Sequence, residues 1–188
     1  MDISRPKRLL VVDDERDLLI LLRKVLAKKC DCDVTIAQSG GEALDKIASW
    51  HPDVIMTDIV MPDMDGLELL KKVYDIDRTV SVVIMTGYGT IEMAVAALKI
   101  GAYDFLEKPF DNAKISQIIL RAFERTQLMR ENLQLHKELQ KSDDHTEFVG
   151  KSIPLQQAID LLTRLSQSDA TVLIRGESGT GKEVAART

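Results

Sequence analysis

The sequence predicts an open α/β sheet of five parallel strands, with helices on both faces, in roughly its first two thirds. Short apolar runs alternate with amphipathic stretches from residue 7 to residue 111, about 20 to 27 residues apart, as in consecutive βα units. Most of these runs are continuously apolar and rich in valine, isoleucine and leucine, which is typical of parallel strands buried on both faces. Five units favour an open, doubly wound sheet, because a closed barrel of this type needs eight.

The expected elements follow in order along the chain. We expect strands at residues 8–12, 34–37, 54–57, 80–86 and 102–106. A helix is indicated after each of the first four strands by apolar residues at helical spacing, beginning just beyond Glu15, Gly41, Gly66 and Thr90. In open sheets of this kind the functional crevice lies beyond the carboxyl ends of the strands.

A long helix is predicted from Asp111 onward, because neither glycine nor proline occurs from there to Gly150. Its first apolar residues should pack on the sheet: Ile115, Ile118, Ile119, Ala122 and Phe123. Farther along, residues at steps of four, three and four form a heptad seam: Leu128, Asn132, Leu135 and Leu139. The seam favours a dimeric coiled coil, and the alternative is a solvated connector helix.

A second unit is expected after the polar break at residues 142–145. Ser152 can cap a helix with Pro154 in its first turn, and residues 170–174 resemble a strand. A glycine-rich loop follows at residues 176–182 (GESGTGK), with the spacing in which backbone N–H groups surround phosphates and Lys182 reaches the terminal ones. The next position, where the general motif has serine or threonine to hold Mg²⁺, is Glu183.

The charge balance limits the partners that the chain can bind. The 188 residues include 25 Lys+Arg and 30 Asp+Glu, a net charge of −5, which argues against nucleic-acid binding by bulk electrostatics. The longest uncharged stretch, residues 79–91, is far shorter than the roughly 20 residues that cross a bilayer. We therefore expect a cytoplasmic protein without a membrane partner. Cys30 and Cys32 lack the partner ligands of a zinc site and are expected to be reduced thiols.

Charged and hydroxyl side chains follow several strands at the carboxyl edge of the predicted sheet: Asp13, Asp14, Asp58, Thr86 and Lys108. Three converging carboxylates repel one another unless a cation neutralises them, and all-oxygen ligands suit Mg²⁺ or Mn²⁺. The alternative for Asp13 and Asp14 is an acidic cluster at a helix start. The positions of Asp58 and Lys108 favour instead phosphoryl transfer, with Asp58 attacking while the metal and Lys108 balance the charge.

Four segments resemble the receiver domain of two-component response regulators: residues 11–15 (VVDDE), 58–66 (DIVMPDMDG), 85–89 (MTGYG) and 101–110 (GAYDFLEKPF). The resemblance implies a flavodoxin-like sheet of order 2-1-3-4-5. It also implies that a sensor histidine kinase phosphorylates Asp58. Mg²⁺ would bind Asp14, Asp58 and the Val60 carbonyl, with Asp13 acting through water. Thr86 and Tyr103 match the positions that report phosphorylation, and Lys108-Pro109 matches the family's cis peptide.

The second unit is similar to the start of the AAA+ ATPase domain of sigma-54-dependent activators. Residues 148–152 match its beginning, and the Walker A loop is matched by Gly176, Glu177, Ser178, Gly179, Thr180, Gly181, Lys182 and Glu183. A Walker B carboxylate, a sensor arginine and a sigma-contacting loop are missing from this sequence. We therefore expect that the chain itself is not an enzyme and that ATP is a cofactor only of a full-length protein.

Together these resemblances indicate an NtrC-like, sigma-54-dependent response regulator. The expected parts are a receiver (residues 1–123), a helical dimerisation linker (124–145) and the first part of an ATPase (146–188). Phosphorylation would change how two copies pair through receiver and linker, whereas sigma-54 RNA polymerase and DNA would be contacted by regions outside this chain. The alternatives are a P-loop nucleotide-binding or ATPase module with an accessory acidic domain, and a binding module that is never phosphorylated. Because neither Val60 nor Tyr88 can orient an attacking water, a long-lived phosphoaspartate is expected.

Overall fold

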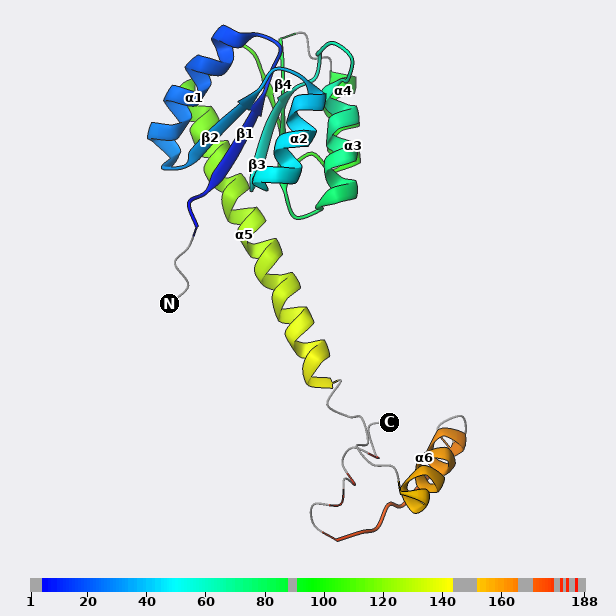
Figure 1. Cartoon of the computed structure of the whole chain (residues 1–188). Helices are drawn as coiled ribbons and strands as arrows, with labels where there is room; N and C mark the ends of the chain where they lie inside the picture. Colours follow the sequence, from blue (N-terminus) through cyan, green and yellow to red (C-terminus); the bar gives the residue numbers. More distant parts are fainter. Residues whose placement is uncertain are drawn as a thin grey trace. The chain divides into compact units, whose positions relative to one another are not determined.

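The first compact unit, residues 1–132, contains one parallel sheet of five strands in the order β2-β1-β3-β4-β5 (Figure 1). The computed structural model describes residues 5–87, 91–143, 152–165 and 171–177, together with Thr180, Lys182 and Ala185. Each neighbouring pair of strands in this sheet is parallel. The open sheet and its strand order therefore confirm the fold that the sequence predicts.

The strands lie close to the expected positions: β1 (Arg8–Val12), β2 (Asp33–Ala37), β3 (Val54–Asp58), β4 (Ser81–Thr86) and β5 (Asp104–Glu107). The main difference is at β5, which begins two residues later than its apolar run. Gly101 there has a positive φ of 120°, so the chain is still turning where the run begins. The apolar pattern located this strand correctly, but it could not show at which residue the turn ends and the hydrogen-bonded pairing with β4 begins.

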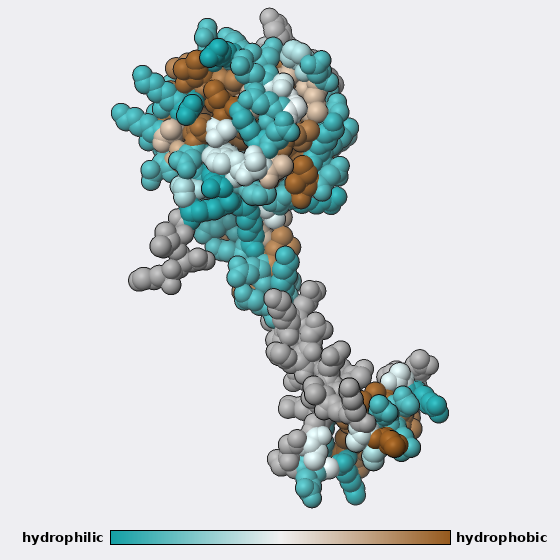
Figure 2. All heavy atoms as spheres, in the orientation of Figure 1, coloured by the Kyte–Doolittle hydropathy of each residue, from teal (hydrophilic) through white to brown (hydrophobic). Residues whose placement is uncertain are grey.

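Helices cover both faces of the sheet, as expected for a doubly wound fold. The helices of this sheet are α1 (Arg16–Cys30), α2 (Gly40–Trp50), α3 (Gly66–Ile76), α4 (Ile91–Ile100) and the first part of α5 (Asn112–Asp143). Helices α1 and α5 pack on one face, and α2, α3 and α4 pack on the other (Figure 1). Each face therefore has its own apolar core. The exposed surface in Figure 2 is mostly hydrophilic, with small apolar patches.

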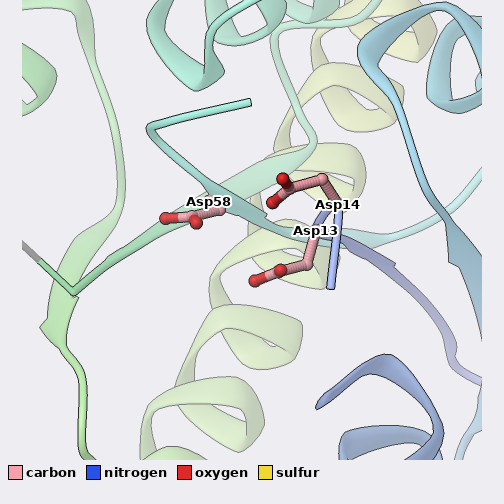
Figure 3. Close-up of side chains that lie close together, drawn as sticks. All are labelled: Asp13, Asp14 and Asp58. Carbon is pink, nitrogen blue, oxygen red and sulfur yellow. The ribbon is translucent and has the colours of Figure 1, made fainter. Parts of the chain in front are cut away.

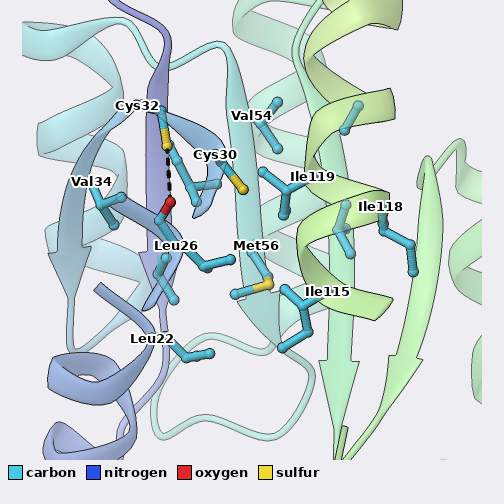
Figure 4. Packing of buried hydrophobic residues seen from close by; sticks show 14 of the residues in the cluster. Leu22, Leu26, Cys30, Cys32, Val34, Val54, Met56, Ile115, Ile118 and Ile119 are labelled. Carbon is cyan, nitrogen blue, oxygen red and sulfur yellow. Dashed lines mark hydrogen bonds between the residues drawn. The ribbon is translucent and has the colours of Figure 1, made fainter. Parts of the chain in front are cut away.

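The core between α1, the sheet and α5 contains both cysteines (Figure 4). Cys30 and Cys32 are buried free thiols, and the Cys32 Sγ lies 3.8 Å from the Leu26 carbonyl oxygen. From the opposite side the predicted α5 residues enter this core: Ile115, Ile118, Ile119, Ala122 and Phe123. Helix α5 then continues without interruption to Asp143, and Leu128 and Leu135 on its later turns are 65% and 59% exposed.

The second compact unit, residues 133–188, differs in one respect from the expectation. Helix α6 (Ile153–Leu165) forms where the capping residues predict it. The described part of the expected strand, residues 171–174, is not in a strand. A strand needs a neighbour to pair its N–H and C=O groups, and every strand in the described part of the chain belongs to the receiver-like sheet. Among the described residues, no helix is both long and apolar enough to span a membrane.

Gly66, the first residue of α3, lies against the end of β3. Its N–H donates to the Ile59 carbonyl at 2.9 Å, and the Asp65 side chain caps the helix by accepting from the Glu68 N–H. A Cβ on Gly66 would lie 2.1 Å from the Asp58 carbonyl oxygen, which is backbone and cannot swing aside. The loop after β3 can therefore approach the strand end closely only because residue 66 has no side chain.

We predict that Gly66→Ala lowers the free energy of unfolding by about 2 kcal/mol, because the added methyl group forces the backbone apart. The control is Gly41→Ala in the first turn of α2, where a Cβ would meet no atom within 4 Å. This control should raise the free energy by about 0.5 to 1 kcal/mol, since alanine favours helix more than glycine does. Urea denaturation measures both values, and equal effects would contradict the steric argument.

Candidate functional site

Three carboxylates meet at the carboxyl edge of the sheet. Asp13 and Asp14 directly follow β1, and Asp58 is the last residue of the adjacent strand β3. One oxygen of each carboxylate lies within 4.8 Å of one oxygen of each of the others, and Figure 3 shows the three side chains gathered there. Asp13 and Asp58 are buried, whereas Asp14 is exposed. The structure thus brings together the three acids that the sequence singled out.

Backbone amides and one lysine hold the buried pair of carboxylates in place. Asp13 Oδ1 accepts from the Glu15 N–H at 2.9 Å, and Asp58 Oδ1 accepts from its neighbour, the Ile59 N–H, at 2.8 Å. The Lys108 Nζ donates to Asp13 Oδ2 at 2.6 Å and to Asp58 Oδ2 at 3.1 Å. Lys108 follows β5, so a residue 50 positions along the chain from Asp58 balances its charge.

Burial and charge act in opposite directions on these groups. Burial raises the pKa of Asp58, and the nearby Asp13 carboxylate adds to that effect, against the lowering influence of Lys108. For Lys108, burial acts to lower the pKa, but the hydrogen bonds and charges of Asp13 and Asp58 outweigh it and raise the pKa. The ammonium group of Lys108 therefore stays protonated beside the two acids.

The donor set fits a hard divalent cation. Among the described residues, the one group of acids, histidines and cysteines that could share a metal ion is Asp13, Asp14 and Asp58. All its ligand atoms are oxygens, which suit Mg²⁺ better than zinc or copper. The exposed Asp14 leaves one side of the cluster open to water and to a phosphate group. These are the ligands that Mg²⁺ keeps besides carboxylates.

Of the two predicted switch residues, one is the last residue of β4 and the other directly precedes β5. Thr86 ends β4 and is fully buried, and its carbonyl accepts from the Lys108 N–H at 2.7 Å. Tyr103 lies just before β5, where its N–H donates to the Val82 carbonyl at 2.7 Å. The expected cis peptide between Lys108 and Pro109 is present. Val60, beyond Asp58, has a side chain that is 58% exposed, and Tyr88 lies outside the described residues.

Two features of this region were missed from the sequence. Gly66 controls how closely the loop after β3 approaches Asp58, whereas the sequence indicated only that it precedes a helix and ends the receiver-like segment 58–66. The Arg125 guanidinium lies 5.9 Å from the centre of the Tyr103 ring, within the range of a cation–π contact. The residues are 22 positions apart in different elements, so spacing gave no signal for this pair.

The glycine-rich loop of the second unit is described in part. Ser178, Gly179, Gly181 and Glu183 lie outside the described residues. The Lys182 Nζ donates to the Gly176 carbonyl at 2.7 Å and also to the Glu177 carbonyl. The Thr180 hydroxyl donates to the Glu177 carbonyl at 2.8 Å. The lysine expected to reach phosphates thus donates to carbonyls of its own loop.

The predicted linker residues occupy the later turns of α5. Leu128 and Leu135 are exposed, as is Asn132, and the side chain of Leu139 is not among those described. A hollow of about 630 Å³ lies beside the first of them and is lined by Tyr103, Arg121, Glu124, Arg125, Leu128, Met129 and Asn132. The hollow connects the predicted switch residue Tyr103 to the start of the heptad seam.

Two family models match the chain. The response regulator receiver domain matches residues 9–120, and the sigma-54 interaction domain matches residues 148–188. The regulatory protein AtoC of Escherichia coli is 37% identical over 96% of this chain and 39% of its own length. The C4-dicarboxylate transport regulatory protein DctD of Rhizobium meliloti is 33% identical over 98% of this chain and 40% of its own length. The chain thus spans about two fifths of these relatives.

Solved structures agree with the sequence relatives. A response regulator receiver domain protein from Clostridium thermocellum is 31% identical, with a TM-score of 0.63 over 65% of this chain and 98% of its own. NtrX from Brucella abortus is 33% identical, with a TM-score of 0.65 over 96% of this chain and 39% of its own. The acids, the lysine and the hydroxyl group expected of a receiver are all present on a sheet of receiver topology. The chain therefore belongs to the response regulator family and consists of a receiver domain followed by part of a sigma-54 interaction domain.

Proposed function

We propose that this chain is the phosphorylation switch of a sigma-54-dependent transcription activator, with Asp58 as the phosphoacceptor. The observation that supports this proposal most strongly is the cluster of Asp58, Asp13 and Asp14, in which Lys108 bridges the two buried acids. Asp58 is the member of this cluster that ends a central strand, so its backbone is fixed by β1 and β4 through β3. A fixed carboxylate beside a cation is suited to in-line attack on phosphorus.

The proposed reaction transfers a phosphoryl group from a phosphohistidine of a sensor kinase. An Asp58 carboxylate oxygen forms the new bond to phosphorus while the P–N bond to the imidazole breaks. The electron pair of that bond stays on the imidazole nitrogen, which takes up a proton from water. Lys108 lies within hydrogen-bond distance of Asp58 and can balance the charge on the transferred oxygens.

Mg²⁺ would be held by the carboxylates of Asp14 and Asp58 and by the Val60 carbonyl, with Asp13 acting through water. When bound, the ion supplies positive charge for the phosphoryl oxygens. Two observations support the role of Asp13 in metal binding. Asp13 is buried, and the Glu15 N–H donates to one of its carboxylate oxygens and fixes it in place. The open side formed by Asp14 supports entry of a phosphodonor.

We infer that Thr86 and Tyr103 pass the change at Asp58 to α5. Thr86 is linked through its carbonyl to Lys108, and a phosphoryl group offers new acceptors for its hydroxyl. Tyr103 lines the same hollow as Leu128 and Asn132 of the linker helix. A shift of Tyr103 would therefore alter the surface next to the heptad seam, which supports control of pairing between two copies.

The proposed output is control of an ATPase that acts on sigma-54 RNA polymerase, with DNA bound by other parts of the protein. It is supported by the sigma-54 interaction match at residues 148–188. Action on RNA polymerase implies a cytoplasmic protein. The alternative, a self-sufficient P-loop ATPase, would need a Walker B carboxylate and a sensor arginine besides the glycine-rich loop, and neither is identified in this sequence. We expect no ATP hydrolysis by this chain in a phosphate-release assay.

Our prediction for the phosphoacceptor is that acetyl phosphate and Mg²⁺ add one phosphoryl group to the wild type and none to Asp58→Asn. Asp63→Asn is the matched control, because Asp63 is an exposed acid in the loop after β3 and its positive φ of 67° is tolerated by asparagine. Intact-protein mass spectrometry measures the products. A phosphorylated Asp58→Asn protein would reject Asp58 as the acceptor.

The lifetime of the phosphoaspartate gives a second prediction. Val60→Asn should shorten the half-life severalfold, because an amide at this exposed position can orient a water toward phosphorus, whereas valine cannot. Val60→Ala, which opens space without adding a polar group, should remain close to the wild type. The decay is followed by phosphate release after removal of the phosphodonor, and equal half-lives for all three proteins would contradict the role given to Val60.

For the linker, we predict that the double variant Leu128→Ser with Leu135→Ser weakens pairing of two copies at least tenfold, because it removes two apolar contacts from the seam. The matched control is Leu133→Ser, an exposed leucine of the same helix that lies off the seam. Light scattering over a concentration series measures the dissociation constant. If both proteins pair like the wild type, the helix is a solvated connector and not a coiled coil.

A further inference from the structure

A second polar cluster lies at the opposite end of the sheet from Asp58. Asp53 precedes β3, is 9% exposed, and its carboxylate accepts three hydrogen bonds. The donors are the Arg5 Nη2 at 2.5 Å, the Arg8 backbone N–H at 2.9 Å and the Arg130 Nη1 of α5. A nearly buried carboxylate is thus joined to a helix residue 77 positions farther along the chain.

Arg130 reaches two loops of the receiver at once. Besides Asp53, its Nε donates to the Thr79 hydroxyl at 3.2 Å, and its Nη2 lies 3.6 Å from Asp77 Oδ2. Burial acts to raise the pKa of Asp77, but the hydrogen bonds from Thr79 and the charge of Arg130 outweigh it and lower the pKa. The planar guanidinium group therefore bridges the segments that lead into β3 and β4.

One turn earlier, Thr126 makes a buried contact to the same strands. Thr126 is 1% exposed, and its hydroxyl donates to the Asp53 carbonyl at 2.9 Å and accepts from the Ser81 N–H at 3.2 Å. The Ser81 hydroxyl in turn donates to the Ala122 carbonyl at 3.1 Å. Ala122, Thr126 and Arg130 are spaced by four residues, so they form one stripe along α5. We call Asp53, Ser81, Thr126 and Arg130 the clamp.

The clamp and the heptad seam lie on opposite sides of α5. At about 100° per residue, Arg130 is about 40° around the helix from Thr126, whereas Leu128 and Asn132 are about 200° and 240° from it. The exposure values agree, because Thr126 is buried and Leu128 is 65% exposed. Contacts of the helix with its own receiver therefore leave the seam free for a second copy.

We propose that Asp53 and Arg130 are positioning residues that fix the rotation of the linker helix relative to the receiver, so that the seam points away from it. The proposal rests on the proposed pairing of two copies through that seam. It extends the packed part of α5 from Phe123 to Arg130. Without the clamp, a helix that projects beyond the sheet could turn or fray there, and a change at Tyr103 would no longer alter pairing.

The first experiment measures amide hydrogen exchange in the whole chain for Arg130→Ala, Arg130→Lys and the control Lys137→Ala, which removes an exposed positive charge from the same helix. Arg130→Ala should speed exchange of residues 124–133 roughly tenfold, because charged hydrogen bonds are lost there. Arg130 uses three different nitrogens for Asp53, Thr79 and Asp77, which the single ammonium group of lysine cannot reproduce, so Arg130→Lys should be intermediate. Residues 112–120 serve as the folding control in each protein. Unchanged exchange in Arg130→Ala overturns the clamp.

The second experiment compares pairing with and without beryllofluoride and Mg²⁺ by light scattering. Arg130→Ala should bind the phosphate mimic like the wild type, since Arg130 is at the other end of the sheet. The factor by which the mimic changes the dissociation constant for pairing of two copies should, however, be roughly tenfold smaller than in the wild type. A full response in Arg130→Ala with faster exchange overturns the positioning role. If the wild type does not change its pairing when beryllofluoride and Mg²⁺ are added, the proposed function is refuted. The hydrogen-exchange data then still decide whether the clamp exists.

Discussion

The repulsion among three carboxylates at one sheet edge is the constraint on which the functional part of this structure depends. Bringing Asp13, Asp14 and Asp58 within 4.8 Å of one another requires positive charge, and Lys108 supplies part of it from the end of β5. Strands β1, β3 and β4 carry no charge between their first and last residues, so the charged groups gather at and beyond the strand ends, with Asp58 as the last residue of β3. The parallel order of the sheet thus determines where the chemistry can occur.

Much of this arrangement was predictable because parallel strands align their carboxyl ends. Knowing that Asp13, Asp58 and Lys108 each follow an apolar run was sufficient to expect them at one edge, and the geometry confirms that. Contacts that depend on how far a helix extends past the sheet were not predictable. Asp53 and Arg130 are 77 positions apart, and nothing in the sequence distinguishes either of them from an ordinary exposed charged residue. The strand expected at residues 170–174 was wrong within its described part, because a pattern of residues cannot reveal whether a pairing partner is present.

The polar clusters at the two ends of the sheet differ in how easily they can rearrange. At the carboxyl end the acids are close together, with Asp14 exposed, so under the proposed function the cluster would change its charge by accepting a cation or a phosphoryl group. At the other end, Asp53 is satisfied by three donors and Thr126 is almost completely buried. A satisfied buried network resists rearrangement, since breaking one bond leaves its partners unpaired. The changeable and the rigid parts are therefore separated by the length of β3 and β4.

Within two turns of helix α5, contacts with the receiver end and the proposed pairing seam begins. Continuing the heptad of Leu128 and Asn132 toward the receiver gives Arg125 and Arg121, both of which line the hollow next to Tyr103. In a parallel pair of the proposed kind, these positions would bring like charges together, so pairing is disfavoured upstream of Leu128. The clamp holds the opposite face of the helix as far as Arg130. In the proposed pair, the seam would therefore begin at Leu128, within the last turn that packs on the receiver, and Arg125, next to Tyr103, lies one turn before it.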